Sequence, residues 1–280
     1  MQHLTSKDTF TGNNSLIIRK DWMTVKDDAI KLLQDEQFCL AFELETLSKI
    51  ATSNQLERWV SGFSYNHTEI EHALRYQWAC QFVSGRNVLD IACGTGSGSY
   101  TMAKDGNAKH VTGCDIDPKA IRYASIRNKH ERLTFLTQNA ETFASEDKYD
   151  VIVSFETIEH IANVDSFLEH IKKSLSATGQ FIVSTPISSM VLNETPDNRH
   201  HVREWGFLEF QKIISAYFKI DNIYVQLYPA NLSIWNQLLN LRKKLRTNTV
   251  ISEPQLWSSS IPAKELGKNR NGYQILQCKS

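Results

Sequence analysis

The sequence lacks an excess of charge of either sign. It has 31 lysine and arginine residues, 31 aspartate and glutamate residues, and an isoelectric point of about 7.1. Proteins that bind nucleic acid usually carry a basic face, and a neutral composition gives no sign of one. We therefore expect a partner other than nucleic acid, although a local basic patch would be compatible with these numbers.

Paired cysteines and long apolar runs are missing too. The 5 cysteines are scattered and include no C-x-x-C pair, which predicts reduced thiols rather than a disulfide framework or a structural zinc site. No run of about 18 apolar residues occurs, and residues 1–10 have no basic segment followed by an apolar one. We therefore expect a cytoplasmic protein without a transmembrane segment.

The chain does contain an alternation of short apolar runs, rich in β-branched residues, with segments of helical length. The runs lie at residues 87–92, 110–116, 133–138, 149–155 and 179–185. This order is typical of βαβ units, in which helices cover both faces of a parallel sheet. At 280 residues, the chain can form one large α/β domain with additions.

Further elements are predicted on both sides of this alternation. Residues 21–60 carry two helical patterns, and residues 68–83 carry a third. After the alternation, the pattern predicts a helix at 206–218, a strand at 219–228 and a last strand at 273–278.

A glycine-rich loop follows the first apolar run. In "VLDIACGTGSG" the strand ends at Asp90, and glycines from Gly94 onward let the backbone approach a ligand at the start of the next helix. Asp115 ends the next strand, where an acid can accept hydrogen bonds from a ribose diol. Ser99 replaces the third glycine of the dinucleotide fingerprint, and an acid at position 90 suits a cationic amino group. The loop therefore favours S-adenosylmethionine over a nicotinamide cofactor.

The fourth apolar run leads directly into the stretch "FETIEH", residues 155–160. In a helical turn, Glu156, Glu159 and His160 would occupy positions i, i+3 and i+4 on one face. Groups so placed can bind a divalent cation, which would orient an acceptor hydroxyl and lower its pKa. Without a metal, His160 can act as a general base. A third interpretation is structural, because the helix dipole favours acids in a first turn.

The loop after the fifth run can complete this site. It reads "NETPDNRHHVREW" over residues 193–205 and leaves its strand at the same edge of the sheet, where open α/β sheets bind ligands. Its His200 or His201 could reach the motif as a further ligand. A solvated loop is the alternative interpretation.

Together these motifs resemble the class I S-adenosylmethionine-dependent methyltransferases. The resemblance rests on "VLDIACGTGSG", "VTGCDIDPKAIRYA", "TFLTQNAETF", "YDVIVSFETIEHI" and "FLEHIKKSLSATGQFIVSTP", within residues 75–228. It implies a Rossmann-like α/β fold with a mainly parallel, seven-stranded sheet and helices on both faces. It also implies S-adenosylmethionine as cofactor, with the binding residues Asp90, Ala92, Gly94, Gly96, Asp115, Ile116, Asn139, Ala140 and Phe155.

The same resemblance assigns parts of the cofactor to these residues. Asp115 would bind the ribose, Ile116 would pack on the adenine, and Phe155 would border the cofactor. Asn139 and Ala140 would meet the adenine edge. The family usually has Asp at position 139, so Asn139 keeps an acceptor for the adenine amino group but loses the charge.

Two subfamilies share the motif after the fourth strand. Ubiquinone-type O-methyltransferases carry E-x-x-E-H there, and small-RNA 3′-terminal 2′-O-methyltransferases carry the same motif with a later histidine before a Phe-Glu-Trp-like segment. In this chain "HVREW" places His201 before Trp205, so His201 is favoured over His200. The resulting candidate set, for catalysis and for a divalent cation such as Mg²⁺, is Glu156, Glu159, His160 and His201.

The segment before the glycine loop resembles bacterial methyltransferases linked to sugars, surface glycans and secondary metabolites. Glu57, Arg58, Arg75 and Tyr76 match their E-R-x-V-x-G and H-x-x-R-Y patterns. The resemblance implies that this part covers the cofactor and shapes the acceptor pocket. Tyr76 or Tyr65 would then cap the cofactor or lie in the core.

These observations lead to one expected function and three rivals. We expect methyl transfer from S-adenosylmethionine to a hydroxyl of a small, sugar-like acceptor, with an amine as the open alternative. The rivals are an RNA 3′-end 2′-O-methyltransferase, a non-catalytic cofactor-binding module and a nicotinamide oxidoreductase. We expect a helical extension or lid over 1–66, the cofactor-binding core over 67–228 and a completing segment over 229–280, in a chain compatible with a homo-oligomer.

Overall fold

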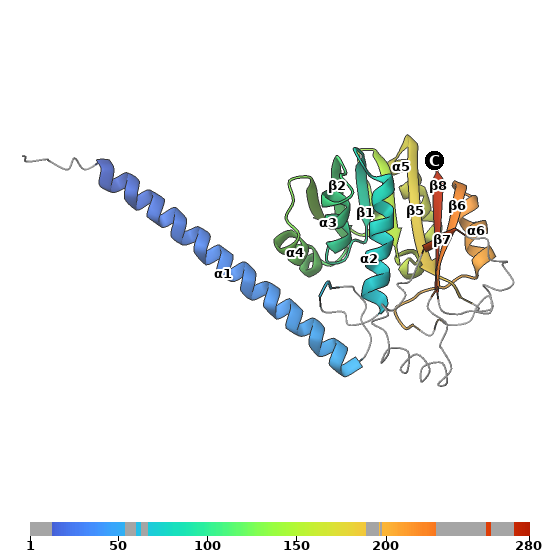
Figure 1. Cartoon of the computed structure of the whole chain (residues 1–280), viewed down its shortest axis with the longest axis horizontal. Helices are drawn as coiled ribbons and strands as arrows, with labels where there is room; N and C mark the ends of the chain where they lie inside the picture. Colours follow the sequence, from blue (N-terminus) through green and yellow to red (C-terminus); the bar gives the residue numbers. More distant parts are fainter. Residues whose placement is uncertain are drawn as a thin grey trace, which may run out of the picture.

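The strands of the described residues form one sheet (Figure 1). The computed structural model describes residues 13–53, 60–62, 67–188, 196, 198–227, 256–258 and 272–280. The strands are β1 (Asn87–Ile91), β2 (His110–Asp115), β3 (Leu133–Thr137), β4 (Tyr149–Phe155), β5 (Leu175–Pro186), β6 (Lys219–Leu227), β7 (Leu256–Ser258) and β8 (Gly272–Lys279).

The order of the strands across the sheet is β3-β2-β1-β4-β5-β8-β6-β7. The strands β1 to β5 pair in parallel, whereas β8 runs antiparallel to both of its neighbours. This arrangement confirms the predicted Rossmann-like fold with a mainly parallel sheet. The short strand β7 pairs with the edge of β6, so the described sheet has eight strands where seven were predicted.

Helices connect the strands as the alternation predicted. They are α1 (Asn13–Ser53), α2 (His67–Ala79), α3 (Ser97–Lys104), α4 (Pro118–Arg127), α5 (Val164–Ser174) and α6 (Phe207–Ser215), with short 3₁₀ turns η1 (Cys80–Phe82), η2 (Ala140–Thr142) and η3 (Ile158–His160). Local sequence explains where they begin. The Asp117 side chain accepts a hydrogen bond from the Lys119 N–H at 2.8 Å, and Pro118 then opens α4.

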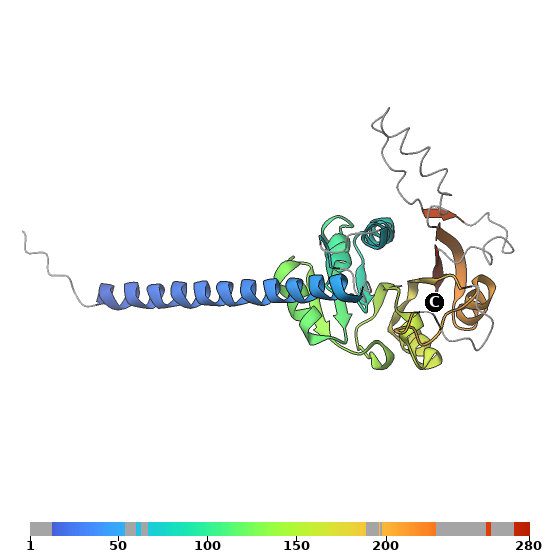
Figure 2. The ribbon, with the colours of Figure 1, turned by 90° about the horizontal axis from the view of Figure 1, so that it is seen from below.

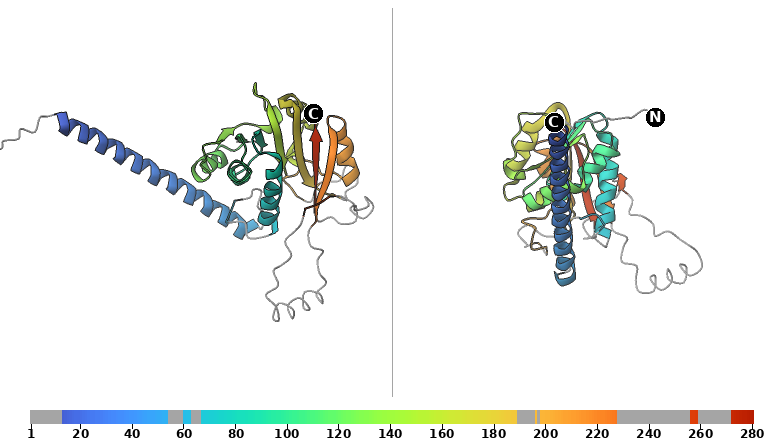
Figure 3. Two further views of the ribbon diagram at one scale, coloured as in Figure 1. Left: turned by 45° about the horizontal axis from the view of Figure 1, so that its top comes forward. Right: turned by 90° about the vertical axis from the view of Figure 1, so that its left-hand side faces the viewer.

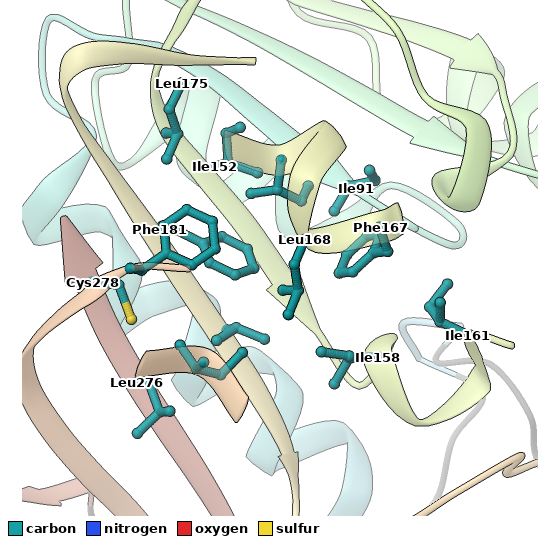
Figure 4. Packing of buried hydrophobic residues seen from close by; sticks show 14 of the residues in the cluster. Ile91, Ile152, Ile158, Ile161, Phe167, Leu168, Leu175, Phe181, Leu276 and Cys278 are labelled. Carbon is teal, nitrogen blue, oxygen red and sulfur yellow. The ribbon is translucent and has the colours of Figure 1, made fainter. Parts of the chain in front are cut away.

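Helices lie on both sides of the sheet (Figure 2), and a cluster of buried apolar side chains fills each side. On one face, side chains of α5 and α6 pack against alternate residues of the strands, including Phe181 and Val183 of β5 (Figure 4). On the other face, Tyr76 of α2 and Met102 of α3 pack with Ile182. Because successive strand residues point to opposite faces, the apolar run of β5 serves both layers.

Helix α1 is one continuous helix, not the two helices that the patterns predicted. No glycine or proline interrupts it, so nothing in its sequence separates the two patterns. At 1.5 Å per residue, it is about 60 Å long. Its later part packs on α4 through Phe38, Cys39 and Phe42, which contact Tyr123 and its neighbours. Its earlier part extends beyond the domain (Figures 1 and 3).

Several predicted features lie outside the described residues. Glu57, Arg58 and Tyr65 belong to this group. None of the helices in the described part of the chain combines the length and the apolarity that crossing a membrane requires.

The central layer between the sheet and α5 should dominate stability. We expect Phe181→Ala to lower the free energy of unfolding by about 3–5 kcal/mol, because the buried ring leaves a cavity. Leu208→Ala, at an exposed leucine of α6, is the control and should change it by less than about 0.5 kcal/mol. Urea denaturation followed by circular dichroism measures both, and similar losses in the two variants would contradict this packing.

Candidate cofactor and catalytic site

The predicted site residues follow five neighbouring strands. The carboxyl ends of the parallel strands β1 to β5 meet at one edge of the sheet, where open α/β sheets bind their ligands. The glycine loop leaves β1, and the "FETIEH" stretch leaves β4. The fold therefore brings both motifs to one edge.

The glycine loop is held in a left-handed backbone conformation. Gly94 and Gly96 have φ angles of 57° and 79°, and Ala92 has φ 62°. A Cβ atom at Gly96 would lie 2.4 Å from the Phe135 ring, so this position requires glycine for space as well as for backbone. Ala92 accepts a conformation that costs an L-residue about 1 kcal/mol, which marks this turn as constrained.

Tyr76 lies beneath this loop, in the core. A Cβ atom at Gly98 would lie 2.2 Å from the Tyr76 ring, so the missing side chain makes room for the aromatic ring. The Tyr76 and Phe155 rings form a T-shaped pair, with ring centroids 5.0 Å apart. Of the two predicted roles of Tyr76, the structure shows the core role.

A buried carboxyl group connects these parts. Asp90 accepts hydrogen bonds from the Tyr76 hydroxyl at 3.0 Å and from the Ser99 hydroxyl at 2.5 Å. Burial raises the pKa of Asp90 to about 7, while the two hydroxyl donors act in the opposite direction. Asp90 thus contacts α2 and α3 of its own chain, and its predicted contact with a cofactor amino group stays a prediction.

Asp115 joins the ends of β1 and β2. Its carboxylate oxygens accept hydrogen bonds from the Gly94 N–H at 3.0 Å and from the Asp117 N–H at 2.9 Å. The carboxylate therefore fixes the glycine loop relative to the loop that begins α4. A predicted ribose ligand would meet an acid that is already positioned.

The predicted adenine residues follow the ends of β2 and β3. Ile116 is 61% exposed, an unusual position for a large apolar side chain and one that a flat ring could cover. Asn139 is exposed, and its side-chain oxygen accepts the Glu141 N–H at 2.9 Å, which caps η2. Ala140 is half-buried at the start of that turn.

The "FETIEH" stretch differs from the predicted helical turn. Glu156 has φ 51°, in the left-handed region, and the 3₁₀ turn η3 begins only at Ile158. The prediction that the two glutamates and His160 share one helical face is therefore wrong. The left-handed conformation of Glu156 lets the chain turn sharply as it leaves β4, before η3 begins.

The two glutamates meet the end of β5 through adjacent residues. The Ser184 hydroxyl donates to Glu156 at 2.6 Å, and the Thr185 hydroxyl donates to Glu159 at 3.1 Å. Adjacent strand residues point to opposite faces, so the two carboxyl groups approach β5 from opposite faces of the sheet.

Glu159, His160 and His201 form a compact cluster. One ligand atom of each lies within 4.8 Å of the others. Backbone hydrogen bonds bring the loop of His201 to η3, because the Val202 and Arg203 N–H groups donate to the Glu159 carbonyl at 2.8 and 3.2 Å. Glu156 is not a member of this group, so the structure brings together three of the four predicted residues.

Both histidines of the cluster are oriented through Nδ1. His160 Nδ1 lies 2.8 Å from the His200 carbonyl oxygen, and His201 Nδ1 lies 2.6 Å from a Glu204 carboxylate oxygen. Hydrogen bonds of this kind orient metal-binding histidines and leave Nε2 to the metal. His201 Nε2 lies 2.9 Å from the Asn198 amide nitrogen, which a cation would have to replace.

Glu159 carries a group that a cation would satisfy. Its side chain is buried, and its Oε1 atom has no hydrogen-bond partner within the described part of the chain. Burial, followed by the charge of Glu156, raises the pKa of Glu159 well above its usual range. The residues present therefore fit a divalent cation, which would neutralise this carboxylate and complete its coordination.

Glu156 has a different environment. Burial raises its pKa, and the nearby Arg75 guanidinium partly opposes this effect. Arg75 is itself buried, with Nη1 donating to Gln226 at 2.6 Å and the guanidinium lying 4.2 Å from the centre of the Tyr273 ring. The buried Arg75 guanidinium thus favours the charged form of Glu156.

Sequence reasoning did not identify Ser184, Thr185 or Glu204. The spacing H-x-x-E in "HVRE" is a signal for Glu204, since a carboxylate three residues after a histidine can orient it. The two hydroxyl residues offered no such signal, because their role depends on how β5 pairs with β4.

Comparisons with known proteins identify the family of the chain. The chain matches the family described as "Methyltransferase domain" over residues 82–242. A probable S-adenosylmethionine-dependent methyltransferase of Mycolicibacterium smegmatis is 30% identical over 182 residues, which cover 63% of this chain and 69% of that protein. A ubiquinone biosynthesis O-methyltransferase of Rickettsia akari is 31% identical over 105 residues, or 37% of this chain and 41% of that protein.

A solved structure supports the fold. The N-methyltransferase NodS from Bradyrhizobium japonicum, in complex with S-adenosyl-L-homocysteine, superposes with a TM-score of 0.52 at 17% identity. The superposition covers 85% of this chain and 98% of that chain. At this identity the likeness concerns the fold alone.

The buried carboxyl of Asp90 predicts a pH dependence of stability. Because the pKa of Asp90 is raised to about 7, the folded chain holds a proton that the unfolded chain releases near 3.8. The resulting stability is present at low pH and is lost as the pH rises through about 7. We expect the free energy of unfolding, relative to that of Asp90→Asn, to fall by a few kcal/mol between about pH 5 and pH 8.

Urea denaturation at several pH values measures this difference. The control is Asp105→Asn, which changes an exposed carboxylate at the end of α3 and should follow the wild type. Parallel curves for wild type and Asp90→Asn would show that Asp90 does not hold the proton.

Proposed function

The chain belongs to the methyltransferase domain family and is an S-adenosylmethionine-dependent methyltransferase, and we propose that it methylates a hydroxyl group of a small, sugar-like acceptor. The observation that carries the proposal is the cluster of Glu159, His160 and His201 beside the glycine-loop edge. A hydroxyl becomes a good nucleophile only as it loses its proton, whereas a neutral amine is a good nucleophile while it keeps its protons. A site with a base and buried carboxylates therefore favours an oxygen acceptor.

The transfer itself requires two aligned reactants. The acceptor oxygen attacks the methyl carbon, and the C–O bond forms as the S–C bond breaks. The sulfonium becomes a neutral thioether, and the acceptor proton leaves to a base. Holding both reactants in line supplies a large part of the rate.

The cofactor would lie across the edge formed by β1, β2 and β4. In this proposal Asp115 binds the ribose, Ile116 covers the adenine, and Phe155 borders the methionine end. Support comes from the position of the Asp115 carboxylate against the glycine loop and from the exposure of Ile116. The full proposed set is Asp90, Ala92, Gly94, Gly96, Asp115, Ile116, Asn139, Ala140 and Phe155.

The acceptor would approach from the side of η3 and the His201 loop. With Nδ1 donating to the His200 carbonyl, a neutral His160 carries its lone pair on Nε2 and can take the acceptor proton. Glu204 would keep His201 in the matching orientation. Glu156, held by Ser184, would act on the acceptor side without joining the cluster.

A divalent cation would be held by Glu159, His160 and His201. When bound, it would act as a Lewis acid that stabilises the acceptor oxygen as an alkoxide. Two imidazoles with one carboxylate suit a first-row transition ion such as Mn²⁺ better than Mg²⁺, which prefers oxygen ligands.

The sugar class rests on the segment before the glycine loop. Arg75 and Tyr76 match the patterns of sugar and glycan methyltransferases and are both buried. The Arg75 guanidinium acts on Glu156, and the Tyr76 hydroxyl donates to Asp90. An RNA 3′ end is the second candidate, because the Glu159–His160–His201 cluster also fits that subfamily. The neutral composition argues against it. The division at residues 66 and 228 and the cytoplasmic location stay predictions.

A panel of acceptors tests the proposed function. We expect the labelled methyl group of S-adenosylmethionine to be transferred to small hydroxylated molecules, sugars first, and not to RNA with a free 3′ end. Mass spectrometry of the product then locates the methyl group on oxygen or nitrogen. Transfer to RNA alone, or to amines alone, would contradict the proposal, and no transfer to any acceptor would favour the non-catalytic module.

The cation is tested by a measurement that does not depend on the acceptor. Calorimetric titration of the metal-free protein with Mn²⁺ should give one site, which Glu159→Gln removes. Glu204→Gln should weaken Mn²⁺ binding by about 10–100-fold, because it frees the His201 ring. His110→Ala, at a histidine that begins β2, is the control and should leave binding unchanged.

The same variants locate the role of the cation in the reaction. If a cation is required, a chelator and Glu159→Gln should each abolish methyl transfer. Added Mn²⁺ should restore the activity of the chelated wild type but not that of Glu159→Gln. Transfer that survives the chelator, Glu159→Gln and His201→Ala would leave His160 as a base without metal.

A further inference from the structure

Helix α1 presents two opposite faces over its later part. One face packs on α4, where Phe38, Cys39 and Phe42 contact the domain. Charged residues of the same region point to α4 as well, since Arg127 pairs with Glu36 and Glu43. The opposite face is exposed, and its composition is apolar rather than charged.

The exposed face has the spacing of a coiled coil. Its side chains alternate in steps of three and four residues, which keeps them on one line along an α-helix. These side chains, called the α1 seam, are Ile30, Leu33, Gln37, Leu40, Leu44 and Leu47. All are exposed, and the apolar members are between 41% and 71% exposed.

An apolar stripe of this kind is unusual on a projecting helix. Single exposed leucines are normal, but a continuous row marks an interaction surface. Long helices in water also depend on packing of their apolar face. The domain uses the opposite face, so the α1 seam has no partner among the described residues.

We propose that the α1 seam binds the α1 seam of a second copy of this chain, forming a parallel, in-register coiled coil. The seam contains no charged residue, so its burial removes no charge from water. In register, the Gln37 side chains of the two copies meet and can hydrogen-bond to each other. A single polar residue at such a position is known to set register and strand number.

Gln37 favours the parallel orientation. An antiparallel pairing that placed Ile30 of each copy opposite Leu47 of the other would put Gln37 opposite Leu40, so the amide would lose a polar partner. In the parallel pairing, Gln37 faces Gln37 of the second copy.

The geometry of the domain also permits this pairing. Because α4 packs on the face of α1 opposite the seam, the two domains would lie on the outer sides of the helix pair. The seam spans residues 30–47, so at 1.5 Å per residue it is about 27 Å long and offers only a small interface. We therefore expect a dimer that dissociates on dilution.

Two adjacent leucines provide a matched test. Leu33 lies in the seam and is 71% exposed, while Leu32 lies beside it, outside the seam, and is 72% exposed. Light scattering on the full chain at tens of micromolar should give twice the 32.0 kDa mass for the wild type and for Leu32→Glu. Leu33→Glu should give the monomer mass, with a dissociation constant raised at least about a hundredfold.

Cysteine crosslinking tests the orientation. Gln37→Cys should form a disulfide-linked dimer under mild oxidation, because the two residues meet in the parallel pairing. Lys31→Cys, exposed and outside the seam, is the control and should stay monomeric on a non-reducing gel.

Three outcomes would overturn the proposal. They are a monomeric wild type, equal effects of Leu33→Glu and Leu32→Glu, and no crosslink at position 37. Circular dichroism and S-adenosylhomocysteine binding of each variant show whether the domain is still folded. Because those readouts concern the cofactor site, a failure of the dimer is distinguishable from a failure of the proposed function.

Discussion

The buried carboxyl group of Asp90 holds the cofactor edge together. It lies in β1, one residue before the strand ends, and accepts hydrogen bonds from the Tyr76 hydroxyl of α2 and the Ser99 hydroxyl of α3. Tyr76 in turn lies against Gly98 and Phe155, so the glycine loop and the end of β4 share one support. The position of the cofactor loop relative to the acceptor side therefore depends on hydrogen bonds that are closed to water.

A second constraint acts on the acceptor side: burying a charged carboxylate costs free energy. Glu156 and Glu159 lie close enough for the charge of one to raise the pKa of the other, and burial acts in the same direction. Such a pair is stable only when protons or cations reduce its charge. The Arg75 guanidinium opposes the rise in the pKa of Glu156, whereas His160 and His201 lie beside Glu159. The chemistry proposed for the site thus follows from how each carboxyl group is neutralised.

Much of the fold was predictable from periodicity. The runs that became β1 to β5 had the expected length and order, because apolar, β-branched strands buried on both faces leave a plain pattern. The joining of two helical patterns into α1 was not predicted, since both patterns fit separate helices equally well. The cluster of Glu159, His160 and His201 was predictable from their types and positions, but the left-handed Glu156 was not. Backbone strain after a strand leaves no periodic signal.

The contacts of Ser184 and Thr185 have a consequence for folding. Phe155 at the end of β4 pairs with Ser184, and the two adjacent hydroxyls then meet the two glutamates from opposite faces. A slip of β5 by one residue would exchange which hydroxyl points to which layer. Neither glutamate would then find its donor, and both would be buried without it. Assembly of the acceptor side therefore discriminates between the native strand alignment and its nearest misfolded alternatives.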